Sequence, residues 1–211
     1  MKELDINIDE LPFTDFLSAR YMISAKVNVE KLWNYSKEND LSFFTLSLGM
    51  LLSGLNEVPV LKRRIVDDKV VEYDYLDAVC PLIDEEKGLF REMRVPVIEK
   101  FNNILDWHDY VRKAQSDILK GKNDGFTMDL QDRDEENIAN FSCIPWIDFE
   151  AATNAVATGN QIQPLITWGK VNENYEMTVS ITVSHIFVFG RDVAYFFEYI
   201  QDNFNNFEKF L

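Results

Sequence analysis

The chain has 211 residues, of which 46% are hydrophobic and 13% aromatic, so it is long and apolar enough to fold around one substantial core. Thirty-six acidic against 21 basic residues give a formal net charge of −15, which repels phosphate backbones and excludes nucleic-acid binding through a basic surface. The longest apolar run, around 43–52, is too short to span a bilayer, and the N-terminal segment lacks an apolar run of signal-peptide length. We therefore expect a single domain over residues 1–211 in a reducing cytoplasm, with no membrane and no nucleic-acid partner.

Hydrophobic periodicity predicts the elements in chain order. Tyr21, Ile23 and Ala25 alternate on one side of a strand, and the apolar run "LSFFTLSLGMLLSGLNEV" predicts a buried helix. The elements expected in the first half are a strand within 16–28, a helix at 29–40 that Asn28 caps, the buried helix at 41–58, a hairpin with its turn at 67–69 and a long second strand at 70–83, a strand at 88–97, and an amphipathic helix at 100–120.

The second half begins with a polar, charged surface excursion at 120–140. The elements expected after it are a strand at 141–144, a short element after Trp146, two strands at 163–171 and 176–188 joined by a hairpin turn "NENY", and an amphipathic helix at 191–207. This mixture predicts an α/β fold (an α+β two-layer sandwich) with one large mixed β-sheet flanked by helices.

The two histidines have different surroundings. His185 ends the alternating strand "TVSITVSHIFVFG" and is followed by apolar residues, so it is either a core residue or a general base. His108, between aspartates in "DWHDY", is expected to be a solvated surface histidine. The motifs GxGxxG, GxxxxGK[ST], HExxH and GxSxG are absent. Two histidines with two scattered cysteines are too few ligands for a zinc site, and the cysteines, in apolar segments, are expected to be buried free thiols.

Three stretches resemble motifs of the chloramphenicol acetyltransferase family. They are "NFSCIPWIDF" with Ser142, "QPLITWGKV" with Thr167, and "SITVSHIFVFGRD" with His185. The family carries N-[IVF]-S-x-x-P-W-x-x-F, A-P-x-x-T-x-[AG]-K and Q-V-H-H-A-x-x-D-G in this order. The stretch "SARYMISAKVNVEKL" also looks like the family's strand–helix entry, so the resemblance spans roughly the whole chain.

The resemblance implies a homotrimer with sites between subunits, acetyl-CoA as co-substrate, no metal, and an antibiotic-resistance role. The acetyl group moves directly to a hydroxyl of a small-molecule acceptor, chloramphenicol or a related compound. By this resemblance His185 is the general base, Ser142 donates to the oxyanion, and Thr167 holds a water beside it. The other implied site residues are Tyr21, Phe90 and Trp146 for the acceptor and Lys170 for CoA.

The chain departs from the family pattern in two places. The family aspartate four residues after the base is Phe189 here, and the position of its arginine partner falls at Ile6. Replacing both members of a buried ion pair with well-packed apolar residues is often neutral, so we expect the base to remain in place. Asp192 is an alternative orienting residue, expected to point to solvent. Glu92, at a position where relatives have a small residue, argues against chloramphenicol as the natural substrate.

Other interpretations stay open at this point. Without the motif context, Ser142 is an ordinary strand-end serine, Thr167 a β-forming threonine, and the basic cluster 62–64 a solvated strand face. A catalytically impaired trimeric homologue that binds a small molecule would keep the same fold. A third alternative is acylation of a different hydroxyl or amine by a longer acyl-CoA.

Overall fold

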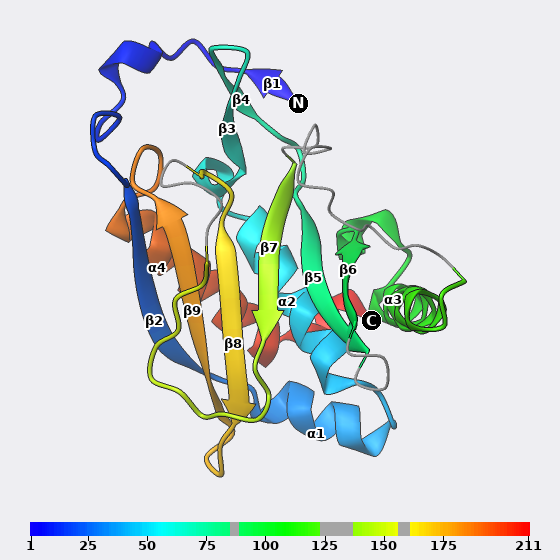
Figure 1. The fold of residues 1–211 in the computed structure, drawn as a ribbon. Coiled ribbons are helices and arrows are strands. Elements are labelled where there is room, and N and C mark those ends of the chain that lie inside the picture. Colours follow the sequence, from blue (N-terminus) through cyan, green and yellow to red (C-terminus); the bar gives the residue numbers. More distant parts are fainter. Residues whose placement is uncertain (85–88, 123–136, 156–160) are drawn as a thin grey trace.

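The computed structural model describes residues 1–84, 89–122, 137–155 and 161–211, which form two sheets with helices packed on one of them (Figure 1). The large sheet, in spatial order, consists of β2 (Arg20–Asn28), β9 (Glu176–Ser184), β8 (Leu165–Val171), β7 (Ile138–Cys143), β5 (Asp77–Asp84) and β6 (Leu89–Val95). The small sheet consists of β1 (Lys2–Glu3), β4 (Lys69–Glu72) and β3 (Arg63–Val66). Strand β7 runs parallel to β5 and β8, whereas the other pairs are antiparallel, so the expected mixed sheet is confirmed.

In Figure 1, helices α2 (Phe43–Asn56) and α4 (Gly190–Asn205) lie behind the large sheet. Helix α1 (Glu30–Glu38) lies at the lower end of the sheet, and α3 (Ile104–Leu119) lies beside the edge strand β6. Short 3-10 turns are η1 (Ile8–Glu10), η2 (Pro59–Lys62), η3 (Ile98–Lys100) and η4 (Phe207–Phe210). Helix α2 is buried over nearly its whole length, as its continuous apolar sequence predicts. None of the described helices combines the length and apolar character needed to cross a membrane.

The predicted hairpin forms, but its long second strand does not. The chain leaves the small sheet after β4 and enters the large sheet at β5, with residues 73–76 between them. The Asn56 side chain accepts from the N–H of Leu76 at 2.8 Å and donates to its carbonyl at 3.1 Å. Because both main-chain groups of Leu76 bind this amide, they are unavailable to a strand ladder, which explains the break.

Several other predicted elements differ from the structure. The strand predicted over 176–188 ends at Ser184, where a turn begins, and the strand predicted at 141–144 spans Ile138–Cys143. Helix α3 begins at Ile104 and not at residue 100, because the Asn103 side chain accepts from the N–H of Asp106 at 2.8 Å and caps the helix. Residues 147–155 form no helix or strand, so the short element expected after Trp146 is wrong within the described part of the chain. Most of the predicted charged excursion, residues 123–136, lies outside the described residues.

Two polar side chains are more buried than the sequence predicts. His108 is only 6% exposed, and its Nε2 accepts from the main-chain N–H of Ser42 at 3.1 Å, so the prediction of a surface histidine is wrong. Arg64 is 1% exposed, and its guanidinium donates to main-chain carbonyls, including that of Ile138 at 2.7 Å. Both groups therefore serve as buried partners of the main chain, which short-range patterning does not reveal.

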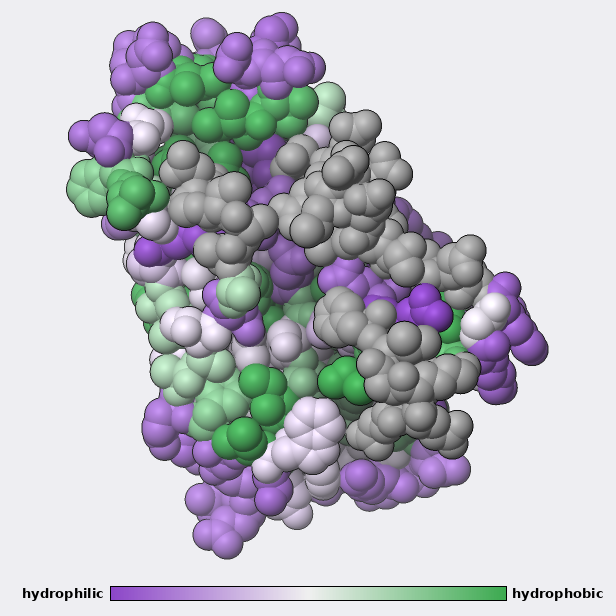
Figure 2. Space-filling model, in the orientation of Figure 1, coloured by the Kyte–Doolittle hydropathy of each residue, from purple (hydrophilic) through white to green (hydrophobic). Residues whose placement is uncertain are grey.

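The face of the sheet opposite the helices carries hydroxyl side chains. Ser24 and Ser180 lie across from each other on β2 and β9, and their oxygens are 2.6 Å apart. Residues alternating with them, such as Ile23 and Ile181, belong to the core on the other side. In the same orientation, Figure 2 shows one group of apolar side chains over the N-terminal segment and the small sheet and another over the lower part of the large sheet, with hydrophilic and near-neutral residues between them.

Candidate active site

The imidazole of His185 lies in the turn that follows β9. Its main-chain N–H donates to the carbonyl of Ala19 at 2.7 Å, which extends the β2–β9 pairing beyond the end of the strand. Its Nδ1 lies 2.9 Å from the carbonyl oxygen of Val188. Because a carbonyl oxygen only accepts, Nδ1 carries the proton and Nε2 keeps its lone pair. A neutral imidazole in this tautomer is what a general base requires.

Three aromatic rings surround this imidazole. Phe13 stacks on it with centroids 4.4 Å apart and an interplanar angle of 21°, and the rings of Tyr21 and Phe189 lie at 4.7 and 5.0 Å. Burial, and secondarily the nearby charge of Asp192, raises the pKa of the Tyr21 phenol. Sequence reasoning missed Phe13, whose φ of 61° places a bulky residue in the left-handed region. No spacing signal could have connected it to a residue so distant in sequence.

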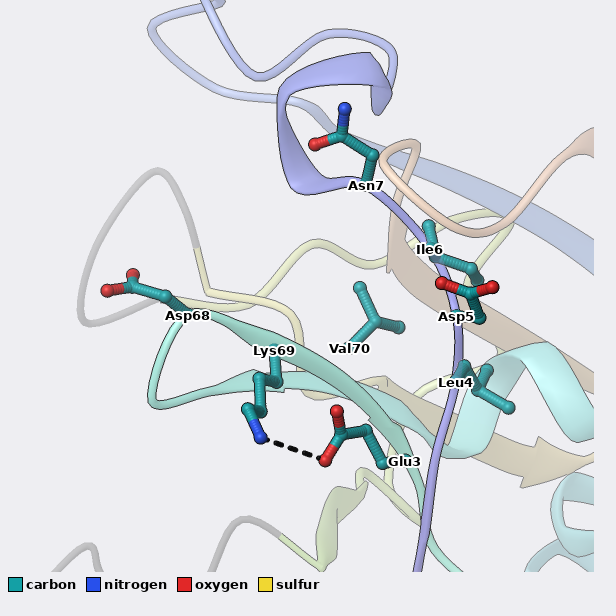
Figure 3. Close-up of a pocket in the computed structure, with 8 residues that line it drawn as sticks. All are labelled: Glu3, Leu4, Asp5, Ile6, Asn7, Asp68, Lys69 and Val70. Atoms are coloured by element: carbon teal, nitrogen blue, oxygen red, sulfur yellow. Dashed lines mark hydrogen bonds and ion pairs between the residues drawn. The ribbon is translucent and has the colours of Figure 1, made fainter.

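Ile6 and Phe189, at the positions of the family's arginine and aspartate, do not pack as a buried apolar pair. Ile6 lies beside β4, in a pocket whose other lining residues include Glu3 and Lys69, joined by an ion pair of 3.0 Å (Figure 3). Phe189 is 46% exposed, so the prediction of a well-packed replacement is wrong for this residue. Asp192 also differs from expectation, because its Oδ2 accepts from the N–H of Phe189 at 2.8 Å.

Ser142 and Thr167 lie side by side on the face of the sheet opposite the helices. They are directly paired on the parallel strands β7 and β8, so their side chains share a face. The Thr167 hydroxyl is buried and accepts from the side-chain amide of Asn154, a residue that sequence reasoning missed because it lies in an irregular segment. Within the described part of the chain the Ser142 hydroxyl makes no side-chain hydrogen bond, so it is available as a donor.

Within one copy of the chain, His185 lies far from the Ser142–Thr167 hydroxyl pair. Thr167 faces Ser180 on β9, and His185 is five residues further along the chain. At ~3.3 Å per residue and ~4.8 Å between strands, Ser142 and His185 are separated by about 19 Å within the sheet. His185 and the hydroxyl pair of a single copy are therefore too far apart to contact one small molecule.

A cavity of about 340 Å³ opens where β8 ends near α1 and α2. Its lining includes Trp33, Phe44 and Trp168, and Lys170 lies on it. The ammonium of Lys37 stands 4.5 Å from the centre of the Trp33 ring, so a second cation lies beside the same cavity. Lys37 is a further residue that sequence reasoning missed. The cavity combines aromatic surface with positive charge, which suits a ligand that has a ring and phosphate groups.

Of the remaining two predicted acceptor residues, Trp146 and Phe90, only Trp146 has a side chain that the structure describes. Trp146 is 69% exposed in the segment that follows β7. The backbone of Phe90 begins β6 opposite Ile83, but its side chain lies outside the described part of the structure. Its role in acceptor binding stays a prediction.

The fold is a helix-backed mixed sheet with a histidine in the turn after one strand and paired hydroxyls on two others, and the family match defines the class of this protein as an acyltransferase. The chain belongs to the chloramphenicol acetyltransferase family, whose model matches residues 11–201. It is 21% identical over 194 residues to chloramphenicol acetyltransferase 3 of Escherichia coli, covering 90% of this chain and 88% of that protein. It is 23% identical to the Bacillus pumilus chloramphenicol acetyltransferase, with 86% and 81% covered.

Solved structures show the same fold. A chloramphenicol acetyltransferase structure superimposes with a TM-score of 0.80 at 23% identity, covering 95% of this chain and 98% of that chain. The cubic core of a pyruvate dehydrogenase multienzyme complex gives a TM-score of 0.70 at 11% identity, with 97% and 87% covered. The expected fold class is thus confirmed, and the same architecture recurs at very low sequence identity.

Proposed function

We propose that residues 1–211 form one acyltransferase domain that moves an acetyl group from acetyl-CoA to a hydroxyl of a small-molecule acceptor, chloramphenicol or a related compound. His185 takes the proton from the acceptor hydroxyl as its oxygen attacks the thioester carbonyl. The tetrahedral oxyanion that results is stabilised by Ser142, with Thr167 holding a water beside it. Collapse of this intermediate expels the CoA thiolate, which receives the proton from His185.

The observation that carries this proposal is the state of the His185 ring. Its Nδ1–H is engaged by the Val188 carbonyl, so the lone pair is confined to Nε2. Stacking on Phe13 restricts rotation of the ring and covers one of its faces. A residue that served only to fill the core would not need a fixed tautomer with an available lone pair.

The hydroxyl pair supplies the complementary function. Thr167 accepts from Asn154, so its own O–H remains a donor, and the adjacent Ser142 hydroxyl has no competing side-chain partner among the described residues. In a water-excluded site, one such donor to an oxyanion contributes about 3 kcal/mol to transition-state stabilisation. A free Ser142 hydroxyl beside Thr167 supports a role for Ser142 as a hydrogen-bond donor to the oxyanion.

We propose further that the site is completed between copies of the chain in a homotrimer. The separation of about 19 Å between His185 and Ser142 within one copy requires the base of one subunit to act beside the hydroxyl pair of another. Exposed apolar residues accompany both halves: Leu17 is 97% exposed in the segment before β2, and Ile147 is 56% exposed after β7. Exposed hydrophobic residues of this kind are typical of protein interfaces.

Acetyl-CoA is assigned to the aromatic cavity at the end of β8. Trp33 and Phe44 provide flat surface for the adenine ring, and Lys37 and Lys170 provide charge for the phosphates. The net charge of −15 makes such local cations necessary, because the chain as a whole repels an anionic co-substrate. No metal is needed for this chemistry, and the cytoplasmic location expected from the sequence stays a prediction.

The test is release of free thiol from acetyl-CoA in the presence of chloramphenicol and of a panel of other alcohols. We expect His185→Ala to abolish the release, and Ser142→Ala to lower kcat by ~10²- to 10³-fold with little change in KM. Ser24→Ala is the matched control, since Ser24 lies on the same face but outside the proposed site. Sedimentation of the parent protein reports whether it is a trimer.

The competing function is that of a trimeric binding protein that has lost turnover. Phe189 at the position of the family aspartate is the observation that favours it. Calorimetric binding of chloramphenicol without thiol release from any acceptor would favour this alternative. Thiol release that depends on both His185 and Ser142 would exclude it.

A further inference from the structure

A single peptide group connects the His185 ring to a carboxylate. The carbonyl oxygen of the Val188–Phe189 peptide accepts from His185 Nδ1 at 2.9 Å and from the Tyr21 hydroxyl at 3.2 Å. The N–H of the same peptide donates to Asp192 Oδ2 at 2.8 Å. The bond from His185 and the bond to Asp192 therefore form a continuous path from carboxylate through amide to imidazole, and the Tyr21 hydroxyl joins it at the carbonyl.

This path gives Asp192 an electrostatic influence on the ring. A carboxylate that accepts from an amide N–H draws positive charge to that hydrogen and leaves the carbonyl oxygen more negative, and hydrogen bonds in such chains strengthen one another by about 10–30% each. A more negative Val188 carbonyl binds the Nδ1–H of His185 more tightly. It also stabilises the positive charge that the ring acquires when Nε2 takes a proton.

The start of helix α4 holds the carboxylate in place. Phe189 is the N-cap residue but has no side-chain acceptor, so the Asp192 carboxylate in the first turn is the group that binds its N–H. An anion at this end of a helix is also stabilised by the helix dipole. The family aspartate that the resemblance places four residues after the base is absent here, and Asp192 supplies a carboxylate from seven residues after it.

Other charged groups near this turn are engaged elsewhere or lack a path to the ring. On β2, the guanidinium of Arg20 donates from Nη1 to the carbonyls of Gln161 and Gln163. On α4, Arg191 Nε donates to the Tyr195 hydroxyl at 2.8 Å. In the segment before β2, Asp15 is exposed and makes no side-chain hydrogen bond within the described residues. Tyr21 is the remaining titratable group, and it donates to the same carbonyl as His185.

We propose that Asp192 is the positioning residue of His185 and acts through the Val188–Phe189 peptide. It fixes the tautomer with the lone pair on Nε2 and favours the protonated ring that forms during acyl transfer. This inference rests on the proposed function of His185 as the general base. It assigns to Asp192 the orienting part that the family gives to a different residue.

Asp192→Asn provides the decisive variant, because the amide oxygen still accepts from the Phe189 N–H while the negative charge is removed. Glu198→Gln is the control, since Glu198 is exposed on the same helix and loses the same charge. The ring nitrogens are followed by NMR as a function of pH, and kcat and KM are measured across the same range. The chain has two histidines, so His108 serves as an internal reference in every spectrum.

We expect the His185 ring to lose its proton at lower pH in Asp192→Asn than in the parent protein, because the negative charge that favours the protonated ring is removed. We expect kcat to fall about 10-fold with KM unchanged, and the acidic limb of the pH–rate profile to shift with the ring. An unchanged His185 titration, or a shift no larger than that in Glu198→Gln, overturns the inference. If the titration shifts but neither parent nor variant releases thiol, Asp192 positions the ring and the proposed catalytic function is wrong.

Discussion

Two glycines in the stretches that resemble family motifs should respond in opposite ways to substitution by alanine. Gly169 is buried on β8, and a Cβ atom there would lie 2.9 Å from the Ile147 carbonyl oxygen and 2.9 Å from a ring carbon of Phe149. The backbone of Ile147 is held in this position because its carbonyl accepts from the N–H of Lys170 at 3.0 Å. At Gly190, the first residue of α4, nothing lies within 4 Å of the added atom.

The magnitudes follow from these contacts. Overpacking against a fixed backbone costs about 1–3 kcal/mol, so Gly169→Ala should lower the melting temperature by roughly 2–12 °C for a chain of this size. Gly190→Ala should raise the free energy of unfolding by about 0.4–1 kcal/mol, because alanine restricts the unfolded chain and is compatible with the helix. Scanning calorimetry together with urea unfolding measures both effects.

The segment that presses on Gly169 also carries Asn154, the partner of Thr167. We therefore expect Gly169→Ala to reduce turnover more than its loss of stability explains, measured well below the melting temperature. A Gly169→Ala protein as stable as the parent would refute the steric argument. Equal destabilisation by both substitutions would show that chain flexibility, and not the contact with Ile147, is the relevant factor.

Three further outcomes are expected. Asn56→Ala should cost ~2–4 kcal/mol of unfolding free energy by urea titration, because both main-chain groups of Leu76 lose a buried partner; a loss below ~1 kcal/mol would contradict this. His108→Ala should cost ~1–3 kcal/mol and His108→Gln less, because glutamine can still accept from the Ser42 N–H; equal losses would contradict the role of the hydrogen bond. Burial raises the pKa of the Cys143 thiol to about 12, so at pH 8 the reactive thiolate is ~10³-fold scarcer than in the unfolded chain. Alkylation of Cys143 should accordingly be slow in the folded protein, become faster as the pH rises toward 12, and be rapid in urea.

The raised pKa values of the two cysteine thiols also affect how the stability of the fold depends on pH. A thiol whose pKa is higher in the folded state favours folding below its unfolded pKa, and this contribution is lost as the pH rises toward the folded value. Both Cys143 and the fully buried Cys80 have raised pKa values, in each case mainly because burial disfavours the charged form. Stability should therefore decline at strongly alkaline pH, and replacement of both thiols by alanine should reduce this alkaline slope.

Sequence patterning was most informative where the type of side chain reflects its surroundings. The alternation of apolar and hydroxyl side chains along β9 predicts a strand, and the continuous apolar run of α2 predicts a buried helix. The long strand predicted after residue 70 was wrong because the side chain of Asn56, distant in sequence, engages Leu76. A partner of this kind cannot be read from the local pattern.

In the candidate site, too, some residues could be predicted from the sequence and others depend on contacts made only in the folded chain. The local pattern at the end of β9 singled out His185 as a core residue or a general base, and the resemblance added Ser142 and Thr167, which the structure places side by side on adjacent strands. Phe13 was not predicted, because its contact with the imidazole depends on the path of the chain before β2. Asp192 was expected to face solvent, since an acidic residue in the first turn of a helix is usually exposed and its bond to Phe189 depends on the local turn.

Strand β2 has consequences for how the protein is made. It lies at the edge of the large sheet, and its partner β9 is synthesised 148 to 164 residues later, as the pairs Asn28–Glu176 and Arg20–Ser184 show. At ribosomal rates of ~5–20 residues per second, the emerging strand waits about 7 to 33 s for that partner. During this interval an unpaired apolar strand is open to association with other nascent chains. Yield in a host cell should therefore depend on chaperone capacity and growth temperature more strongly than the stability of the finished enzyme would indicate.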